Sequence, residues 1–227
     1  MQSTPVHDHH NPELLNFIPS GSISLIEIGC SSGALARAYK TQLPGCHYLG
    51  VEVDAAYAEL AKRYCDDCLV LDIESAPDSF WQDQSERDCW IFGDTLEHLK
   101  DPWTVLRRIR DVISRKGVVV ACIPNAQHWT LQAKLSVGDF RYQESGLMDK
   151  THLRWFTRQT IIELLDYAGF RIEAGVPRVM SNEPKTTREA VLAGIERMAE
   201  AMGADPKVAV ADALPLQYVI LARPIWP

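Results

Sequence analysis

Residues 24–33 read SLIEIGCSSG, in which a short apolar run is followed by two glycines, Gly29 and Gly33. A helical pattern begins directly afterwards, at Ala34. Glycine at the carboxyl end of a strand lets the backbone approach a ligand closely, and ligands of open α/β sheets sit at such strand ends. The stretch therefore predicts a strand, a tight turn and a helix that together bind a ligand.

The acidic side chain of Glu27 limits which ligand this turn can bind. Nicotinamide dinucleotides are held by a Gly-x-Gly-x-x-Gly loop with the pyrophosphate at the helix start, and Gly29 and Gly33 do not have that spacing. A carboxylate before the turn repels a pyrophosphate and attracts a cation. The Gly-x-x-x-x-Gly-Lys-Ser/Thr loop that cradles phosphates is also missing from the sequence. Glu27 therefore favours a ligand that carries a positively charged amino group.

The first half of the chain alternates strand and helix patterns. Apolar runs predict strands at 23–28, 48–53, 69–73, 90–92 and 118–123. Apolar spacing at i, i+3, i+4 and i+7 predicts a helix at 54–64, and a second helix is predicted at 101–114, where Asp101 is the expected N-cap and Pro102 fits the first turn. Apolar strands separated by helices indicate a parallel sheet covered on both faces. We therefore predict a doubly wound, Rossmann-like α/β fold.

The last third is predicted to belong to the same single domain, residues 1–227. A helix at 157–168 is expected to be capped by Thr157 and stopped at Gly169. Strands at 170–176 and 217–222 flank a helix from about 187 to 202. Residues 1–20 form an N-terminal arm that either covers the ligand or is disordered. The aromatic-rich residues 124–156 are predicted to form a lid or binding insert.

The turn at 27–33 resembles motif I of the class I S-adenosylmethionine-dependent methyltransferases, Asp/Glu-x-Gly-x-Gly-x-Gly. Glu27, Gly29 and Gly33 match the motif, and Ser31 takes the place of its middle glycine. The resemblance implies that this loop, including Cys30, lies against the methionine part of S-adenosylmethionine, in agreement with the charge argument for Glu27. It also implies a seven-stranded sheet in which six parallel strands are joined by an antiparallel seventh near the end of the chain.

Two further strand ends extend the resemblance in the order expected for the family. Residues 50–54, GVEVD, end the second strand, where the family has an acidic residue that accepts both ribose hydroxyls. The resemblance assigns this role to Glu52, with Val53 beside it, since one carboxylate can accept two hydrogen bonds at once. In the third-strand motif, residues 71–73, the resemblance implies that Asp72 and the backbone of Ile73 bind the adenine.

The most specific match follows the fourth predicted strand. Residues 91–102, IFGDTLEHLKDP, strongly resemble the LEHL-x-DP segment of the family. The resemblance implies that Phe92, Gly93 and Asp94 lie beside the methionine and sulfonium of the cofactor. His98 follows Asp94 at i+4, so the two can share a helix face at the cofactor site. The alternative is a histidine that only orients the helix.

The acceptor is expected to meet the insert at 124–156. Residues 146–157, GLMDKTHLRWFT, resemble the D-x-T-H-x-R-F-F-T segment of bacterial methyltransferases often associated with polysaccharide and small-metabolite pathways. A hydroxyl acceptor benefits from a base within hydrogen-bond reach, for which His152 is the first candidate and His128 the second. Asp149, His152 and Arg154 can point to the active site from an extended segment. Alternatively, Asp149, Thr151 and Arg154 form a structural network that closes the lid.

The favoured acceptor is a hydroxyl of a small molecule, with a sugar or saccharide intermediate ahead of an aromatic or polyketide metabolite. Trp129, Tyr142 and Trp155 suit either acceptor, because sugar faces and aromatic rings both pack on aromatic side chains, although each also fits a core position. An amine or protein acceptor stays open, and so does a cofactor-binding scaffold without catalysis. The missing glycine pattern speaks against a nicotinamide-dependent oxidoreductase.

Charge and composition limit the partners and the location. The 227 residues carry a net charge of −7, from 30 acidic and 23 basic side chains, which disfavours a nucleic-acid partner. No apolar run approaches the ~20 residues of a membrane span, and residues 1–12 lack the pattern of a signal peptide, so we expect a cytoplasmic protein. The sequence leaves the oligomeric state open.

We expect no bound metal and no disulfide. The six cysteines, in a chain without a secretion signal, indicate reduced thiols that are mostly buried. Cys65 and Cys68 have the spacing of half a zinc site, but no second pair completes it. Asp94 and Asn125 alone do not make a ligand set for metal-assisted transfer. The cluster at 7–10, HDHH, can catch a metal in vitro, and at a terminus we treat it as incidental.

Overall fold

A seven-stranded sheet runs through the centre of the protein. The structure is a computed structural model that describes residues 8–180 and 184–226. The strands follow the order β3-β2-β1-β4-β5-β7-β6. Their bounds are β1 Ser24–Ile28, β2 His47–Glu52, β3 Asp67–Val70, β4 Cys89–Gly93, β5 Val118–Pro124, β6 Phe170–Arg178 and β7 Gln217–Pro224. β7 pairs antiparallel with β5 and β6, whereas the pairs among β1 to β5 are parallel. The predicted sheet of six parallel strands and an antiparallel seventh is confirmed.

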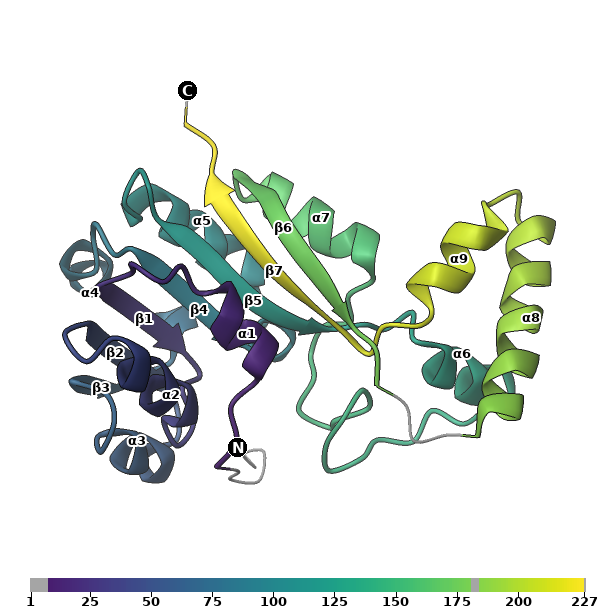
Figure 1. The fold of residues 1–227 in the computed structure, drawn as a ribbon, viewed down its shortest axis with the longest axis horizontal. Helices are drawn as coiled ribbons and strands as arrows, with labels where there is room; N and C mark the ends of the chain where they lie inside the picture. Colours follow the sequence, from purple (N-terminus) through teal and green to yellow (C-terminus); the bar gives the residue numbers. More distant parts are fainter. Residues whose placement is uncertain (1–7, 181–183, 227) are drawn as a thin grey trace.

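Helices cover both faces of this sheet (Figure 1). Buried side chains of α4 (Asp78–Asp83), α5 (Pro102–Val112) and α7 (Arg158–Tyr167) share one core with the strands. Buried side chains of α1 (Pro12–Phe17), α2 (Ala34–Gln42) and α3 (Ala55–Ala61) share the other. Two short 3-10 helices, η1 (Ile73–Ser75) and η2 (Leu96–His98), follow β3 and β4. The doubly wound α/β fold expected from the alternating pattern is confirmed.

Local sequence signals fix where the longer helices begin and end. Asp101 accepts a hydrogen bond from Thr104 N at 3.0 Å, and Pro102 occupies the first position of α5. Thr157 forms a capping box at the start of α7. Gly169 follows that helix with a φ of +81°, in the left-handed region that glycine adopts without steric cost. The predicted caps and the predicted stop are therefore confirmed.

The third strand differs from its prediction. It spans Asp67–Val70 rather than 69–73 and lies at the edge of the sheet, where Leu69 and Val70 are exposed. Asp72 Oδ1 accepts a hydrogen bond from Glu74 N at 2.9 Å, which turns the chain into η1. The apolar run in the sequence extends to Ile73, which is buried in the core although the strand has already ended at Val70. This is why the predicted strand extends too far.

The carboxyl ends of the parallel strands meet at one edge of the sheet. The register pairs Ile28 at the end of β1 with Val51 of β2 and with Phe92 of β4. Gly93 at the end of β4 pairs with Cys122 of β5. The loops that leave these strands therefore begin side by side, which is where open α/β sheets bind their ligands.

Three further helices form a group beyond the ends of β6 and β7 (Figure 1). α6 (Trp129–Ser136) belongs to the predicted insert at 124–156, whereas α8 (Lys185–Ala201) and α9 (Pro206–Asp212) connect β6 to β7. Trp129, Ile195 and Ala213 are buried together between them. The helix predicted at about 187–202 is confirmed as α8, whereas α9 and the packing of this second insert, the β6–β7 connection, against the first were not predicted.

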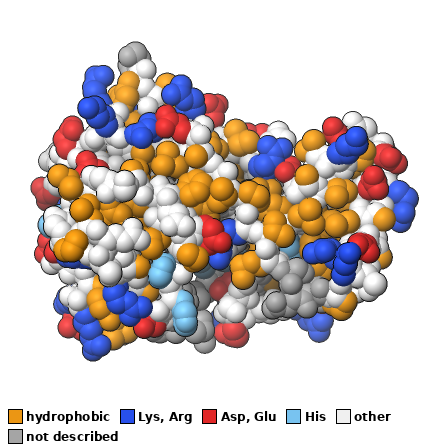
Figure 2. All heavy atoms as spheres, viewed as in Figure 1, with side chains coloured by type: hydrophobic (Ala, Val, Ile, Leu, Met, Phe, Trp, Pro, Cys, Tyr) orange, Lys and Arg blue, Asp and Glu red, His pale blue; other side chains and the backbone are white. Residues whose placement is uncertain are grey.

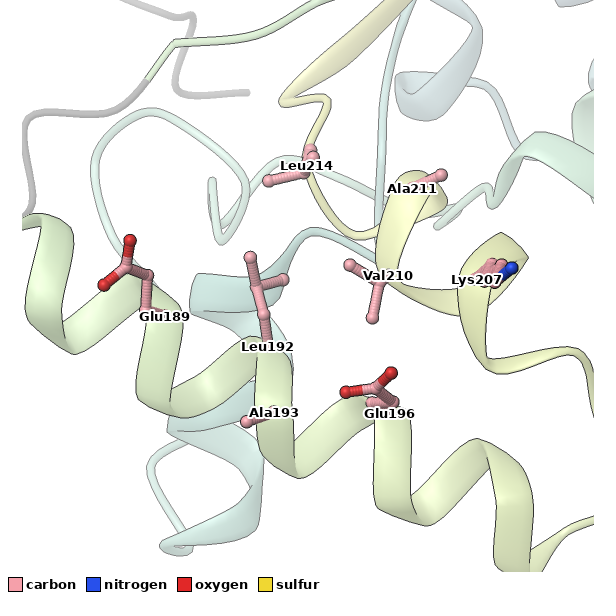
Figure 3. A pocket seen from close by; sticks show the side chains of 8 residues that line it. All are labelled: Glu189, Leu192, Ala193, Glu196, Lys207, Val210, Ala211 and Leu214. Carbon is pink, nitrogen blue, oxygen red and sulfur yellow. The ribbon is translucent and has the colours of Figure 1, made fainter.

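A groove of about 500 Å³ lies between α8 and α9 (Figure 3). Leu192 and Val210 point into it, and Glu189, Glu196 and Lys207 lie at its rim. None of the predicted site residues lines it. The groove is therefore a feature of the second insert and separate from the edge of the sheet where the predicted ligand residues gather.

The surface carries charges of both signs. On the face shown in Figure 2, Lys and Arg side chains lie among Asp and Glu side chains around the periphery, and hydrophobic side chains gather across the middle. In the part of the chain that the structure describes, no helix has the length and apolar character needed to cross a membrane.

Three thiols surround Gly50 in β2. A Cβ atom at this position would lie 2.7 Å from Cys30 Sγ, 3.1 Å from Cys65 Sγ and 3.2 Å from Cys68 Sγ. All three are free cysteines, and Cys30 and Cys65 are buried. The Cys65 and Cys68 pair therefore packs around a glycine, in agreement with the structural interpretation of its spacing.

We expect Gly50→Ala to lower the free energy of unfolding by about 1–3 kcal/mol, because the added methyl group overpacks the space between the three sulfur atoms. Denaturant unfolding followed by circular dichroism measures the difference. Gly45→Ala is the matched control, since a Cβ there meets no described atom within 4 Å. Equal stability of the two variants would contradict the close packing at Gly50.

Candidate functional site

The loop after β1 has the backbone conformations that its glycines were expected to provide. Gly29, Ser31 and Gly33 have φ values of +75°, +47° and +79°, all in the left-handed region. Gly29 N and Cys30 N donate hydrogen bonds to Val51 O at 2.8 and 3.2 Å, which joins the loop to β2. Ser31 therefore adopts the turn in which the family motif has glycine, and the Cys30 side chain is buried beneath the loop.

Glu52 ends β2 with its carboxylate against this loop. Glu52 Oε2 accepts a hydrogen bond from Ser31 N at 2.8 Å, and Oε1 accepts one from Asp54 N at 3.0 Å. The Glu52 side chain is buried, whereas Val53 beside it is exposed. Each carboxylate oxygen has a further lone pair, so Glu52 retains the capacity to accept two hydroxyl hydrogen bonds. Its position and chemistry fit the predicted ribose contact.

Glu27 is a buried acid on the neighbouring strand. Tyr48 OH donates a hydrogen bond to Glu27 Oε2 at 2.9 Å, and a Cβ atom on Gly93 would lie 3.9 Å from Glu27 Oε1. Burial raises the pKa of Glu27 from its ordinary value near 4.5 to about 8. A carboxyl group held in this way gains a large stabilisation of its charged form when a cation binds beside it. The geometry therefore suits the amino group that Glu27 was predicted to attract.

The N-terminal arm packs against the same edge of the sheet. Asn11 caps α1 by accepting hydrogen bonds from Glu13 N and Leu14 N, and its Nδ2 donates to Cys122 Sγ at 3.2 Å. A Cβ atom on Gly93 would lie 3.2 Å from Leu14 Cδ2. From residue 8 onward, the arm is thus packed against the sheet beside Gly93 and Cys122, and its covering of the ligand stays a prediction. His7 of the HDHH cluster lies outside the described residues.

The two predicted adenine-binding residues lie at the turn after β3. Asp72 is partly exposed and its Oδ1 caps η1 through Glu74 N. The side chain of Ile73 is buried in the core, so only its backbone can meet a ligand, as the resemblance implies. Both residues therefore lie at the carboxyl edge of the sheet, beyond Glu52.

The segment after β4 brings its backbone to the centre of this edge. The side chain of Phe92 is fully buried in the core. Asp94 has a φ of +55°, an uncommon conformation for a residue with a side chain and one that clusters at functional sites. Asp94 Oδ1 accepts hydrogen bonds from Gln217 Nε2 and, at 3.5 Å, from Cys122 Sγ. Asp94 N also donates to Cys122 O at 3.1 Å, which fixes the backbone here, and the next residue, Thr95, packs against Gly29 of the loop after β1.

His98 does not share a helix face with Asp94, which corrects the prediction. The positive φ of Asp94 prevents a helix there, and η2 begins only at Leu96. His98 instead packs edge-on against His152, with ring centroids 4.8 Å apart. Its Nδ1 lies 3.1 Å from Thr151 Oγ1 and 3.2 Å from Thr151 O. A residue predicted at the cofactor is therefore joined to the insert.

A buried acid that sequence reasoning did not single out lies beside these histidines. Glu97 is 1% exposed, and its Oε1 lies 4.0 Å from His152 Nε2. Burial and the nearby Asp94 raise the pKa of Glu97, whereas burial lowers the pKa of His98 and His152. The adjacent Glu97 and His98 were visible in the quoted motif, but nothing in the spacing predicts that a histidine of the insert joins them.

The polar residues of the insert take two directions. Asp149 Oδ1 accepts hydrogen bonds from Thr151 N at 2.8 Å and from Thr151 Oγ1 at 2.7 Å, on the side of the histidine pair. Arg154 donates to Lys100 O, and its guanidinium carbon lies 5.9 Å from the centre of the Trp103 ring. Of the two predicted alternatives, a polar face shared by Asp149 and Arg154 does not form, because Arg154 turns to α5, and the structural network stays a prediction.

His128 is the N-cap of α6. Its Nδ1 lies 2.7 Å from Thr130 Oγ1, and burial lowers the pKa of His128 to about 4. A histidine of such low pKa is neutral at pH 7 but weakly basic. Its proposed role as a second general base stays a prediction.

The predicted lid aromatics divide into core and surface. Trp129 is buried against Ile195 in the second insert. Tyr142 and Trp155 are exposed, and both lie near Phe140, with ring centroids at 6.0 and 6.4 Å. Two of the three aromatic side chains are therefore free to pack on an acceptor.

The comparisons with known proteins agree with this fold. Residues 9–174 match the family model described as a methyltransferase domain. The chain is similar to the structure of an S-adenosylmethionine-dependent methyltransferase from Archaeoglobus fulgidus, with a TM-score of 0.62, 18% identity, and coverage of 93% of this chain and 91% of that chain. It is similar to another from Mesorhizobium loti, with a TM-score of 0.58, 15% identity, and coverage of 93% and 96%.

A third similar structure is the magnesium protoporphyrin IX methyltransferase of Synechocystis PCC 6803 with bound S-adenosylhomocysteine. The TM-score is 0.58, the identity is 12%, and the alignment covers 94% of this chain and 79% of that chain. No curated protein matches the sequence. At such identities the structural similarities establish the fold.

Proposed function

This chain belongs to the methyltransferase domain family whose model matches residues 9–174, and on that premise we propose that it transfers the methyl group of S-adenosylmethionine to a hydroxyl of a small molecule. The observation that carries the choice of cofactor is the pair of buried carboxyl groups at the ends of adjacent strands, Glu27 and Glu52. Glu27 suits an ammonium group, and Glu52 suits the two hydroxyls of a diol. A ligand that carries both groups matches them.

The described residues fit this cofactor. The left-handed loop at Gly29, Ser31 and Gly33 keeps side chains away from a ligand that approaches its backbone. Glu52 would accept the ribose hydroxyls, and Glu27 would face the amino group of the methionine part. Asp72 and the backbone of Ile73 would hold the adenine, and the backbone of Gly93 and Asp94 would border the methionine.

When bound, S-adenosylmethionine supplies an activated methyl group on a sulfonium and a neutral thioether as the leaving group. The residues of this chain then have to align the acceptor oxygen with the methyl carbon, exclude water and remove the acceptor proton. The buried group of Glu97, His98 and His152 can serve the last task, and it lies close enough to Asp94 for that carboxylate to raise the pKa of Glu97. A neutral imidazole can either take the proton or hold a cation that lowers the pKa of the hydroxyl.

We propose a sugar or saccharide intermediate as the favoured acceptor. The exposed Phe140, Tyr142 and Trp155 offer aromatic faces on which a sugar ring can pack. An aromatic or polyketide metabolite is the alternative acceptor, because aromatic rings pack on the same side chains. One similar structure is that of a mitomycin 7-O-methyltransferase. That structure is 18% identical in sequence to this chain and has a TM-score of 0.54.

Calorimetric titration of the full chain with S-adenosylmethionine, S-adenosylhomocysteine and NAD tests the choice of cofactor. We expect micromolar binding of the two sulfur compounds and no binding of NAD. Incubation with S-adenosylmethionine and separate panels of sugars, phenols and amines, followed by mass spectrometry, tests the acceptor. Binding of NAD alone would overturn the proposal, and methylation of only the amines would overturn the hydroxyl acceptor.

A further inference from the structure

Three side chains with metal-ligating atoms converge at the boundary between η2 and the first insert. Glu97 and His98 come from η2 after β4, and His152 comes from the insert. One ligand atom from each lies within 4.8 Å of the others. Leu153 N and Arg154 N donate to Glu97 O at 2.8 and 2.9 Å, so backbone hydrogen bonds hold the two segments together. The cluster is therefore a fixed feature of the fold.

The carboxyl group of Glu97 is buried without a hydrogen-bond partner among the described residues. Neither Oε1 nor Oε2 has a hydrogen-bond partner among the described residues, although the side chain is 1% exposed. The 4.0 Å between Oε1 and His152 Nε2 is too long for a hydrogen bond. Burying a carboxyl group without hydrogen-bond partners is strongly unfavourable. A cation at this position would supply the missing partner to both oxygens.

The hydrogen bonds of the two histidines leave an imidazole lone pair on each. His152 Nδ1 lies 3.2 Å from Leu147 O, so Nδ1 carries the proton that this carbonyl accepts. Thr151 Oγ1 donates its own proton to Asp149, and it therefore accepts from His98 Nδ1. Both rings thus present an unprotonated Nε2. A second ring nitrogen that donates to a carbonyl, or to a hydroxyl held by a carboxylate, is the arrangement that orients metal-binding histidines.

We propose that Glu97, His98 and His152 bind a divalent first-row transition metal ion. Two imidazole nitrogens and one carboxylate bind such ions in preference to Mg²⁺ or Ca²⁺, and they leave coordination positions on the ion open. Two donors at about 2.1 Å from one ion are at most about 4.2 Å apart, so side-chain shifts of less than about 1 Å close the site. This proposal departs from the expectation, drawn from the sequence, that no metal is required.

The role of the ion in catalysis rests on the proposed function, whereas its binding does not. A cation in this cluster would lower the pKa of an acceptor hydroxyl that contacts it. The hydroxyl then releases its proton to solvent, and an oxygen lone pair forms the bond to the methyl carbon. The carbon–sulfur bond breaks with its electron pair on sulfur, so the sulfonium becomes a thioether. The reaction consumes no oxidant or reductant and leaves the metal unchanged.

Titration of Mn²⁺ into the full chain, after treatment with a chelator and its removal, tests the site by calorimetry. We expect one ion per chain in the wild type. Glu97→Gln and His152→Gln are each expected to weaken binding by at least about 10-fold, because each removes one ligand. The double variant His9→Ala with His10→Ala is the matched control for adventitious binding by the terminal histidine cluster. It is expected to keep the affinity of the wild type.

Thermal unfolding keeps the test independent of folding defects. Glu97→Gln keeps the shape of the side chain and removes a buried acid, so this variant is expected to fold. Mn²⁺ should raise the Tm of the wild type more than that of Glu97→Gln, since an ion that binds the folded state more tightly stabilises it more by mass action. Equal Mn²⁺ affinity in the wild type and Glu97→Gln, or binding that disappears in the His9 and His10 variant, would overturn the metal site.

A cofactor titration separates this inference from the proposed function. Binding of S-adenosylmethionine without one-site binding of Mn²⁺ overturns the metal and leaves the methyltransferase intact. One-site binding of Mn²⁺ without binding of S-adenosylmethionine supports the metal and overturns the proposed function. Turnover that survives a chelator but is lost in His152→Gln overturns the metal role and assigns His152 as a general base.

Discussion

Glu52→Ala is expected to weaken the binding of S-adenosylmethionine by about 100-fold or more. The carboxylate would accept two ribose hydroxyls, and hydrogen bonds to a charged group contribute roughly 1.5–3 kcal/mol each, so losing both costs at least two powers of ten in affinity. The substitution also frees Ser31 N and Asp54 N, which Glu52 holds at 2.8 and 3.0 Å. Calorimetric titration with S-adenosylmethionine and S-adenosylhomocysteine measures the loss for both compounds.

Glu59→Ala is the matched control for Glu52→Ala. Glu59 is an exposed acid on α3, the helix that follows β2, and its side chain pairs with Lys62 at 2.6 Å on the surface. We expect this variant to bind the cofactor as the wild type does. Circular dichroism of both variants checks that the fold is retained. Wild-type affinity in a folded Glu52→Ala protein would contradict the ribose contact and remove the strongest part of the cofactor assignment.

Glu27 is expected to make the stability of the protein fall as the pH rises from 5 to 8. Burial raises its pKa in the folded state to about 8 from an ordinary value near 4.5. Between these two values the unfolded chain releases the proton while the folded protein retains it, so unfolding becomes more favourable with increasing pH. The stabilisation is complete below the unfolded pKa and is lost by pH 8. By linkage, the free energy of unfolding decreases by about 3–4 kcal/mol through this one group.

Urea unfolding of the wild type and Glu27→Gln at pH 5, 6, 7 and 8 measures this contribution as a difference between the two proteins. Tyr48→Phe is the control variant, because it removes the hydrogen bond that partly stabilises the ionised carboxyl group. We expect a steeper fall with pH in Tyr48→Phe than in the wild type. A wild type and a Glu27→Gln variant with parallel pH profiles would show that the folded and unfolded states bind the Glu27 proton equally well.

The same ionisation predicts how the cofactor affinity changes with pH. An ammonium group beside Glu27 stabilises the ionised carboxylate, so binding releases the Glu27 proton at neutral pH. The affinity for S-adenosylmethionine is therefore expected to increase between pH 6 and pH 8 in the wild type and to stay level in Glu27→Gln. Titrations in two buffers of different ionisation enthalpy detect the released proton.

Most of the fold could be predicted because its signals are local. Apolar runs located strands β1, β2, β4 and β5 within two residues of their observed bounds. Strands that are buried on both faces consist almost entirely of apolar residues, so the sequence shows them as continuous runs. Asp101 and Thr157 marked helix starts because capping depends only on the next three residues. The edge strand β3 was the exception, because only one of its edges is paired and Asp72 ends it early.

The cofactor side of the candidate site was also accessible from the sequence. Glu27, Glu52 and the loop at 29–33 sit at the ends of adjacent parallel strands, so their order along the chain fixes their meeting at one edge. The sequence did not predict the hydrogen bond to Glu27 or the backbone conformation of the loop. That Glu27 is held by Tyr48, and that Ser31 takes a left-handed conformation, follows from contacts between strands and loops.

The sequence by itself determined the sheet, the caps and the place of Glu27 and Glu52 near the carboxyl ends of adjacent strands, because periodicity and strand ends depend on neighbours along the chain. Only the tertiary structure decided that His98 meets His152 rather than Asp94, and that Glu97 lies buried beside His152. It also decided that Arg154 turns to Trp103 and that α8 packs with α6. These pairs are distant in sequence, and their contact follows from how the inserts pack on the sheet, for which no local pattern exists.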